Sequence, residues 1–237
     1  MHDRGLVTLK AAFENAKQQR HAAFIPYFPI GYPDYETSLQ VIASLAESGA
    51  DVIEVGVPFS DPLADGPTIQ AATQKALENG TTLRQCIQAI QSLREQGIQT
   101  PMVLMGYLNP FMAYGFEHLV DDACVAGIDG FVVPDMPADE AALFQPLVET
   151  AEMGLAHFLA PTSSPQRIRL AAEKSRGYIY LVSVTGVTGT STGLPDDLVK
   201  RIADIRLVTQ QPIAVGFGIR TPEHATAVGK IADGVIV

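Results

Sequence analysis

Three acidic side chains lie close together in residues 54–65: Glu54, Asp61 and Asp65. The run 51–57 is mainly apolar and rich in β-branched residues, which predicts a short buried strand. Glu54 interrupts this run, and a buried carboxylate is costly unless it is paired, protonated or hydrated. A carboxylate that exchanges a proton near neutral pH suits general acid–base catalysis. The alternative is a satisfied core carboxylate, with the two aspartates as ordinary loop residues.

The environments predicted for two of these acids differ. Glu54 lies in apolar company, so its pKa should be raised. Asp65 lies in the loop that ends at Gly66, and Pro67 is well suited to the first position of the helix that follows. On that loop Asp65 should remain ionised and accept a hydrogen bond or stabilise a developing positive charge. Two carboxylates in different environments suggest two different roles.

Apolar strands and helical segments alternate along the whole chain. Near-continuously apolar strands are covered on both faces, which indicates a parallel sheet. About eight successive units favour a closed (β/α)8 barrel of the TIM type over an open doubly wound sheet. The strands are expected at residues 22–31, 51–58, 102–107, 130–135, 154–159, 178–184, 212–216 and 233–237. The helices are expected at 6–20, 35–48, 68–77, 82–95, 116–126, 138–152, 166–174, 194–208 and 222–230, with Asn109 and Pro110 in a loop.

The domain organisation predicted from this pattern is simple. No linker or shift in composition interrupts residues 1–237, so we expect one domain. The extra helix at 6–20 precedes the first strand and should plug or flank the core. The phosphate-binding glycine patterns of open nucleotide folds, Gly-x-Gly-x-x-Gly after a first strand and the Walker A loop, are missing. The chain ends at Val237, inside the eighth strand.

Composition excludes several classes of function. The 237 residues carry a net charge of −10 and the sequence pI is near 4.9, which argues against nucleic-acid binding and against a polybasic membrane surface. No run approaches the roughly 20 apolar residues of a membrane span. The two cysteines, Cys86 and Cys124, form no metal or redox motif and fit a reducing compartment. These features predict a soluble cytoplasmic protein.

A barrel of this kind works at the carboxyl ends of its strands. That face would hold Glu54 near the end of the second strand, Asp65 in the loop above it, and Tyr180 on the sixth strand. Two glycine segments, 185–193 and 216–218, follow the sixth and seventh strands and suit an anion such as phosphate. The alternative is that both segments are simply tight turns.

The remaining residue types narrow the chemistry. A Schiff-base aldolase needs a lysine at a strand end, and all six lysines fall in helical stretches. The histidines are scattered, and His157, alone on a strand, is more often a core group than a ligand. Acid–base catalysis without a metal, on a phosphorylated small molecule, is the chemistry that remains.

The segment 58–67, Pro-Phe-Ser-Asp-Pro-Leu-Ala-Asp-Gly-Pro, preceded by Glu54, resembles the signature of tryptophan synthase alpha subunits. The likeness covers essentially the whole chain, and the other matching segments occur in the family's order: Phe24-Ile-Pro-Tyr27, Gly31-Tyr-Pro33, Tyr107-x-Asn109, Pro134-Asp135-Met-Pro137, Tyr178-x-Tyr180, Gly186-Val-Thr-Gly189 and Gly216-Phe-Gly218. The resemblance implies a TIM barrel that cleaves indole-3-glycerol phosphate to indole and glyceraldehyde 3-phosphate, with no cofactor in this chain.

The resemblance also implies roles for single residues. Glu54 would protonate indole C3 and take the glycerol hydroxyl proton. Asp65 would accept from the indole N–H, and Tyr180 would order the site. Further substrate contacts would be Tyr27, Met105, Val132 and Phe158 around the indole, Gly189, Phe217 and Gly218 at the phosphate, and Thr188, which would bond to Asp65 when the loops close.

The family works as an αββα complex whose β subunit carries pyridoxal phosphate and consumes indole. Asp61, Asn109 and Asp135 match surface positions at that interface. The chain departs from the family at Val184, where many members carry an arginine. It also stops before the family's Gly-Ser phosphate segment and last helix, so we expect a chain shortened in this way to bind substrate weakly and to be poorly stable.

Two rival interpretations remain. Another barrel enzyme, such as an indole-3-glycerol phosphate synthase, would need a lysine acid on a strand. A barrel without activity could serve only to bind or activate a β-type partner, but the presence of both Glu54 and Asp65 argues against it.

Overall fold

A computed structural model describes residues 4–183, 196–216, 218–219 and 221–237. Its strands form two five-stranded parallel sheets, in the orders β1-β10-β9-β8-β7 and β2-β3-β4-β5-β6. The strand bounds are β1 Ala23–Ile25, β2 Tyr27–Pro29, β3 Ile53–Gly56, β4 Met102–Met105, β5 Gly130–Val132, β6 Gly154–Ala156, β7 Phe158–Leu159, β8 Ile179–Val182, β9 Ile213–Gly216 and β10 Gly234–Ile236.

The two sheets join into one closed ring. Only Pro26 separates β1 from β2, and only His157 separates β6 from β7. The carbonyl of Pro26 still accepts from Glu54 N at 2.9 Å, and that of His157 accepts from Tyr180 N at 3.1 Å. Each pair is therefore one barrel strand with a local break, and the predicted (β/α)8 barrel is confirmed.

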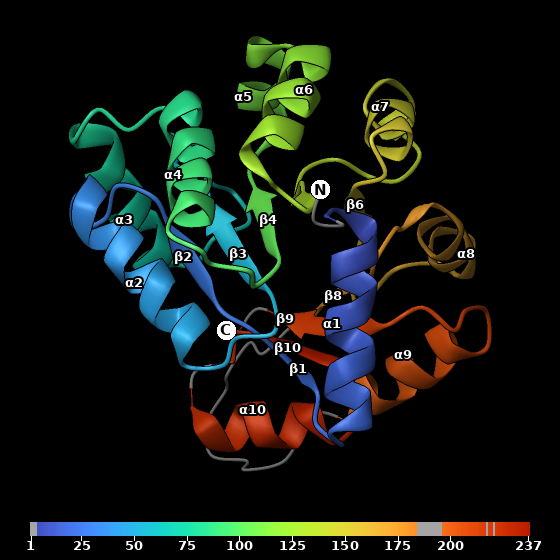
Figure 1. The fold of residues 1–237 in the computed structure, drawn as a ribbon. Coiled ribbons are helices and arrows are strands. Elements are labelled where there is room, and N and C mark those ends of the chain that lie inside the picture. The colour runs from blue at the N-terminus through green and yellow to red at the C-terminus, as the bar shows by residue number, and fades with distance from the viewer. Residues whose placement is uncertain (1–3, 184–195, 217, 220) are drawn as a thin grey trace.

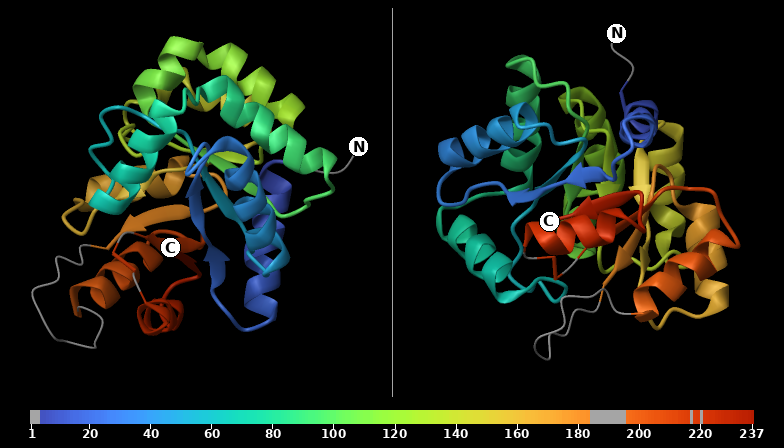
Figure 2. Two further views of the ribbon diagram at one scale, coloured as in Figure 1. Left: turned by 90° about the vertical axis from the view of Figure 1, so that its left-hand side faces the viewer. Right: turned by 90° about the horizontal axis from the view of Figure 1, so that it is seen from below.

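Helices surround the strands in all three views (Figures 1 and 2). Their bounds are α1 Leu6–Gln18, α2 Tyr35–Glu47, α3 Pro67–Glu78, α4 Leu83–Glu95, α5 Leu108–Tyr114, α6 Phe116–Ala126, η1 Ala141–Leu143 (a 3-10 helix), α7 Gln145–Thr150, α8 Pro165–Lys174, α9 Asp196–Arg206 and α10 Pro222–Gly229. Within the described residues, no helix is both long enough and apolar enough to cross a membrane.

Two details of the predicted helices are wrong. Asn109 and Pro110 were expected in a loop, but both lie in the first turn of α5, where a missing proline N–H leaves no helical bond unmade. The helix expected at 138–152 is broken into η1 and α7. Pro146 lies in the first turn of α7, and a proline there cannot continue a helix from the preceding residues.

Inward-facing side chains fill the barrel in one cluster, which includes Val103, Val132, Tyr178 and Tyr180. One side of α1 belongs to the same cluster through Leu9, Ala12, Phe13 and Ala16. The rings of Phe13 and Tyr178 lie 5.4 Å apart. The leading helix therefore closes the barrel interior, as the sequence predicted. Two further apolar clusters fill the space between the strands and the outer helices.

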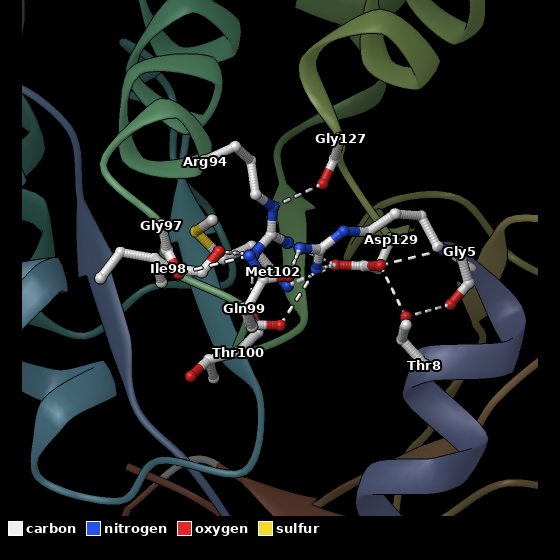
Figure 3. Close-up of polar contacts among 11 residues, drawn as sticks. Gly5, Thr8, Arg94, Gly97, Ile98, Gln99, Thr100, Met102, Gly127 and Asp129 are labelled. Carbon is white, nitrogen blue, oxygen red and sulfur yellow. Dashed lines mark hydrogen bonds and ion pairs between the residues drawn. The ribbon is translucent and has the colours of Figure 1, made fainter. Parts of the chain in front are cut away.

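A buried carboxylate clamps α1 to the barrel (Figure 3). Asp129 Oδ1 accepts from Gly5 N at 2.9 Å and from Thr8 Oγ1 at 2.6 Å. Its Oδ2 accepts from Arg94 Nη2 at 2.6 Å and from Met102 N at 2.9 Å. Asp129 is fully buried, so these four donors replace the hydration that the carboxylate loses on folding. The clamp joins α1, α4 and the starts of β4 and β5.

We expect Asp129→Asn to lower the free energy of unfolding by about 3 kcal/mol or more, because breaking a buried ion pair leaves Arg94 without its partner. In wild type both oxygens of Asp129 accept from donors. An asparagine replaces one of these oxygens by an NH2 group, which is itself a donor and cannot accept. Urea unfolding measures the change. Glu149→Gln is the matched control, since its ion pair with Arg176 is about one-third exposed and should contribute less than about 1 kcal/mol. Equal losses in the two variants would contradict the clamp.

Candidate active site

A cavity of about 650 Å³ opens at the carboxyl ends of the strands. Its lining includes the two acids singled out in the sequence together with aromatic and apolar side chains: Tyr27, Glu54, Asp65, Met105, Tyr180 and Gly218. This is the size and character of a small-molecule site, with a few polar groups on apolar walls. No cluster of three or more possible metal ligands occurs among the described residues.

A larger hollow of about 940 Å³ lies at the opposite end of the barrel, between α1 and the loops before β8 and β9. Lys10, Lys17 and Arg176 line it, but none of the predicted site residues does. Size alone would favour this hollow. The chemistry favours the smaller cavity, because Glu54 and Asp65, two carboxyl groups with raised pKa values, both line it.

Glu54 lies on β3 between Tyr27 of β2 and Val103 of β4, and it is fully buried. Its Oε1 accepts from Tyr178 Oη at 3.0 Å, and its Oε2 has no hydrogen-bond partner among the described residues. Burial raises the pKa of Glu54 to about 8, and the Tyr178 hydroxyl offsets only part of that rise. Glu54 therefore holds a proton at neutral pH, which confirms the predicted direction.

Asp65 is half-buried in the loop between β3 and α3. Its Oδ2 accepts from Tyr107 Oη at 3.2 Å. Burial raises its pKa to about 6, against the lowering effect of the Tyr107 bond. Between pH 6 and pH 8 the cavity thus holds one carboxylic acid, Glu54, and one carboxylate, Asp65. This is the division of protonation states that acid–base chemistry needs.

Aromatic side chains form another part of the cavity wall. Tyr180 on β8 pairs in register with Phe158 on β7, and their rings stack with centroids 4.2 Å apart and an interplanar angle of 18°. A Cβ on Gly216 would lie 2.4 Å from Tyr180 Oη, and one on Gly56 would lie 2.2 Å from Tyr27 Oη. Glycine on the neighbouring strand therefore makes room for each tyrosine in the barrel mouth.

The other predicted residues of the indole pocket lie near these groups. Met105 lines the cavity, and Val132 is its register partner on β5. Phe158 packs against the cluster that fills the barrel interior. Gly218 also lines the cavity and has φ +81, a conformation that favours glycine. Thr188, Gly189 and Phe217, and the unusual Val184, lie outside the described residues.

The three predicted interface residues lie apart from the cavity. Asp61, Asn109 and Asp135 are all exposed and none lines it. Asp135 Oδ1 accepts from Leu108 N at 2.8 Å, at the start of α5. Their exposure leaves them accessible to another protein.

Sequence reasoning assigned no role to two tyrosines that hydrogen-bond to the acids, Tyr178 and Tyr107. A signal existed for Tyr178, because side chains two residues apart on a strand share a face and Tyr180 was already placed inward. Tyr107 comes two residues after the last residue of β4, but its reach to Asp65 depends on how two loops fold together.

Comparisons with known proteins identify the family of this chain. A sequence profile described as tryptophan synthase alpha chain matches residues 13–237. The alpha chain of Dehalococcoides mccartyi is 47% identical over 219 residues, which are 92% of this chain and 86% of the relative. The alpha chain of Chloroflexus aggregans is 42% identical over 225 residues, which are 95% of this chain and 84% of the relative. The chain belongs to the tryptophan synthase alpha chain family.

Solved structures of this family share the fold. A tryptophan synthase from M. tuberculosis in an open form superposes with a TM-score of 0.89 at 35% identity, covering 97% of this chain and 87% of that one. The alpha subunit from Legionella pneumophila also gives 0.89, at 33% identity, covering 97% and 85%. The protein is a tryptophan synthase alpha-type lyase of tryptophan biosynthesis, which cleaves indole-3-glycerol phosphate. The family acts together with a β subunit.

The raised pKa of Glu54 has a consequence for stability. A proton bound more tightly in the folded state stabilises it fully below the ordinary pKa of 4.5, and this contribution is lost as pH rises through about 8. We expect Glu54→Gln to raise the free energy of unfolding by roughly a few kcal/mol at pH 9 and by little at pH 4. Urea unfolding at both pH values measures this, with Glu47→Gln at the exposed end of α2 as control. A gain of equal size at both pH values would contradict a protonated Glu54.

Proposed function

We propose that Glu54 and Asp65 carry out the cleavage of indole-3-glycerol phosphate as a divided acid–base pair. The supporting observation is that both residues line one cavity and that between pH 6 and pH 8 Glu54 is protonated while Asp65 is ionised. The Glu54 acid gives its proton to indole C3, and the positive charge that develops on the ring is stabilised by the Asp65 carboxylate, which accepts from the ring N–H.

The second half of the reaction returns the proton. The Glu54 carboxylate takes the proton of the glycerol hydroxyl next to the scissile bond as the carbonyl of glyceraldehyde 3-phosphate forms. The electron pair of the broken carbon–carbon bond returns to the indole ring and restores its aromaticity. One proton enters the ring and one leaves the hydroxyl, so Glu54 ends the cycle as an acid. The proposed steps use no cofactor in this chain.

The apolar wall would hold the indole between the two acids. Tyr180 and Phe158 form a stacked pair beside the cavity, and Tyr27, Met105 and Val132 complete the apolar surroundings. A flat bicyclic ring fits such a wall because aromatic faces stack favourably. Tyr180 would thereby set the orientation of indole C3 toward Glu54.

The phosphate would bind at the glycine segments after β8 and β9. Gly218 supports this placement, because it lines the cavity and its missing side chain leaves the backbone accessible to an anion. Gly189 and Phe217 are the other proposed contacts. Thr188 would bond to Asp65 when the two loops close over the substrate, and closure would exclude water.

We further propose that this chain assembles with a tryptophan synthase β subunit as an α2β2 tetramer in the cytoplasm. Exposed Asp61, Asn109 and Asp135 support an interface at this end of the barrel. Pyridoxal phosphate would belong to the partner, which would consume the released indole. The family's joint action with a β subunit supports the assembly.

Glu54→Gln should lower indole release by about 10²-fold or more while substrate binding persists, because the amide fills the same space but cannot exchange a proton. Indole release and substrate affinity are measured separately, with and without a β subunit. Glu47→Gln serves as the control. Turnover within twofold of wild type would remove Glu54 from the proposed role.

Asp65→Asn should also slow indole release severely, by about 10²-fold, because a neutral amide cannot stabilise the positive ring. Its activity should stay low at every pH, since the variant has no carboxylate to ionise at this position. The rate is measured from pH 5 to pH 9. A near-normal rate at any pH in this range would refute the assignment of Asp65.

A further inference from the structure

Tyr107 is the residue that joins the rigid barrel to the loop of Asp65. It comes two residues after the last residue of β4, following Gly106, serves as the N-cap residue of α5 and is 4% exposed. Its ring packs on Phe59 with centroids 5.2 Å apart. Phe59 belongs to the same loop as Asp65, so both the ring and the hydroxyl of Tyr107 contact that loop.

The Tyr107 hydroxyl makes two bonds to consecutive loop residues. Its oxygen accepts from Ala64 N at 3.0 Å, and its single hydrogen is donated to Asp65 Oδ2 at 3.2 Å. The first bond fixes the backbone just before Asp65, and the second fixes the carboxylate itself. One side chain therefore sets both the position of the loop and the direction of the acid.

The base of Tyr107 is held far more firmly than the loop that it contacts. A Cβ on Gly106 would lie 2.6 Å from the ring of Phe111, which shows how closely the chain packs there. On the other side, Leu108 N donates to Asp135. In contrast, Leu63 in the Asp65 loop is 92% exposed, so its side chain contributes little packing to hold the loop next to Asp65.

We propose that Tyr107 is a positioning residue for the lyase reaction, whose hydroxyl holds the Asp65 carboxylate over the cavity. The inference rests on the proposed role of Asp65. Functional groups work best when a neighbouring shell fixes them on rigid elements, and here a barrel strand and a helix start supply that support. Tyr107 acts through Asp65 and does not line the cavity itself.

Removing the hydroxyl should change how Asp65 titrates. The donated hydrogen bond lowers the pKa of Asp65, so its loss should raise that pKa above about 6. The other groups facing Asp65 are Glu54 from β3, Tyr27 from β2 and Tyr180 from β8. Burial raises the pKa of both tyrosines, and Glu54 stays protonated up to about pH 8, so Asp65 determines the acidic side of the activity profile.

The test compares Tyr107→Phe with Tyr114→Phe by indole release from pH 5 to pH 9. Tyr114 is a matched control, because its hydroxyl donates to Asp122 and it lies at the far end of the same helix, α5. In Tyr107→Phe, kcat/KM at pH 7 should fall about tenfold to a hundredfold. The acidic limb of the plot of kcat/KM against pH should move to higher pH. Part of the activity should return at pH 8. Tyr114→Phe should match wild type in both respects.

A 3-fluorotyrosine at residue 107 gives a second test that keeps the shape of the side chain. Its more acidic hydroxyl is a stronger donor, so the acidic limb should move to lower pH. The inference is overturned if the acidic limb of the pH profile does not shift in the 3-fluorotyrosine variant. It is also overturned if that limb does not shift in a Tyr107→Phe variant that is folded. Asp65→Asn assayed alongside separates the two proposals: if that variant is active, the role of Asp65 itself fails, and if it is inactive while Tyr107→Phe equals wild type, only the role of Tyr107 fails.

Discussion

The burial of one carboxyl group, that of Glu54, is the constraint on which the site depends. The barrel removes its hydration and, among the residues that the structure describes, returns a single hydrogen bond, from Tyr178 to one of its two oxygens. An ion in that position is costly, so the group keeps its proton at neutral pH. The same burial that reduces stability at high pH makes Glu54 a proton donor.

The scaffold maintains this arrangement from both ends of the barrel. At the closed end, the Asp129 clamp holds α1, whose Phe13 packs on the ring of Tyr178. Tyr178 in turn reaches Glu54, so a line of contacts runs from the clamp to the acid. At the open end, Tyr107 holds Asp65, and the lower burial of that loop leaves Asp65 ionised above about pH 6.

Much of this could be predicted from the sequence, because the informative signals are local. Apolar runs and helical periods predict the barrel, and Glu54 is conspicuous as an acid inside a strand. The clamp was not predictable, because Gly5 and Asp129 are 124 positions apart and meet only once the barrel closes. Gly216 was associated with an anion, but the structure shows that it also makes room for Tyr180. Pro146 breaks a helix that the apolar pattern alone would continue.

The most direct test of the account is the protonation state of Glu54, followed by infrared difference spectroscopy between wild type and Glu54→Gln across a pH titration. A protonated carboxyl band should be present at pH 6.5 and should disappear with a midpoint near pH 8. A carboxylate band already complete at pH 6, with a midpoint near the ordinary value of 4.5, would contradict the account.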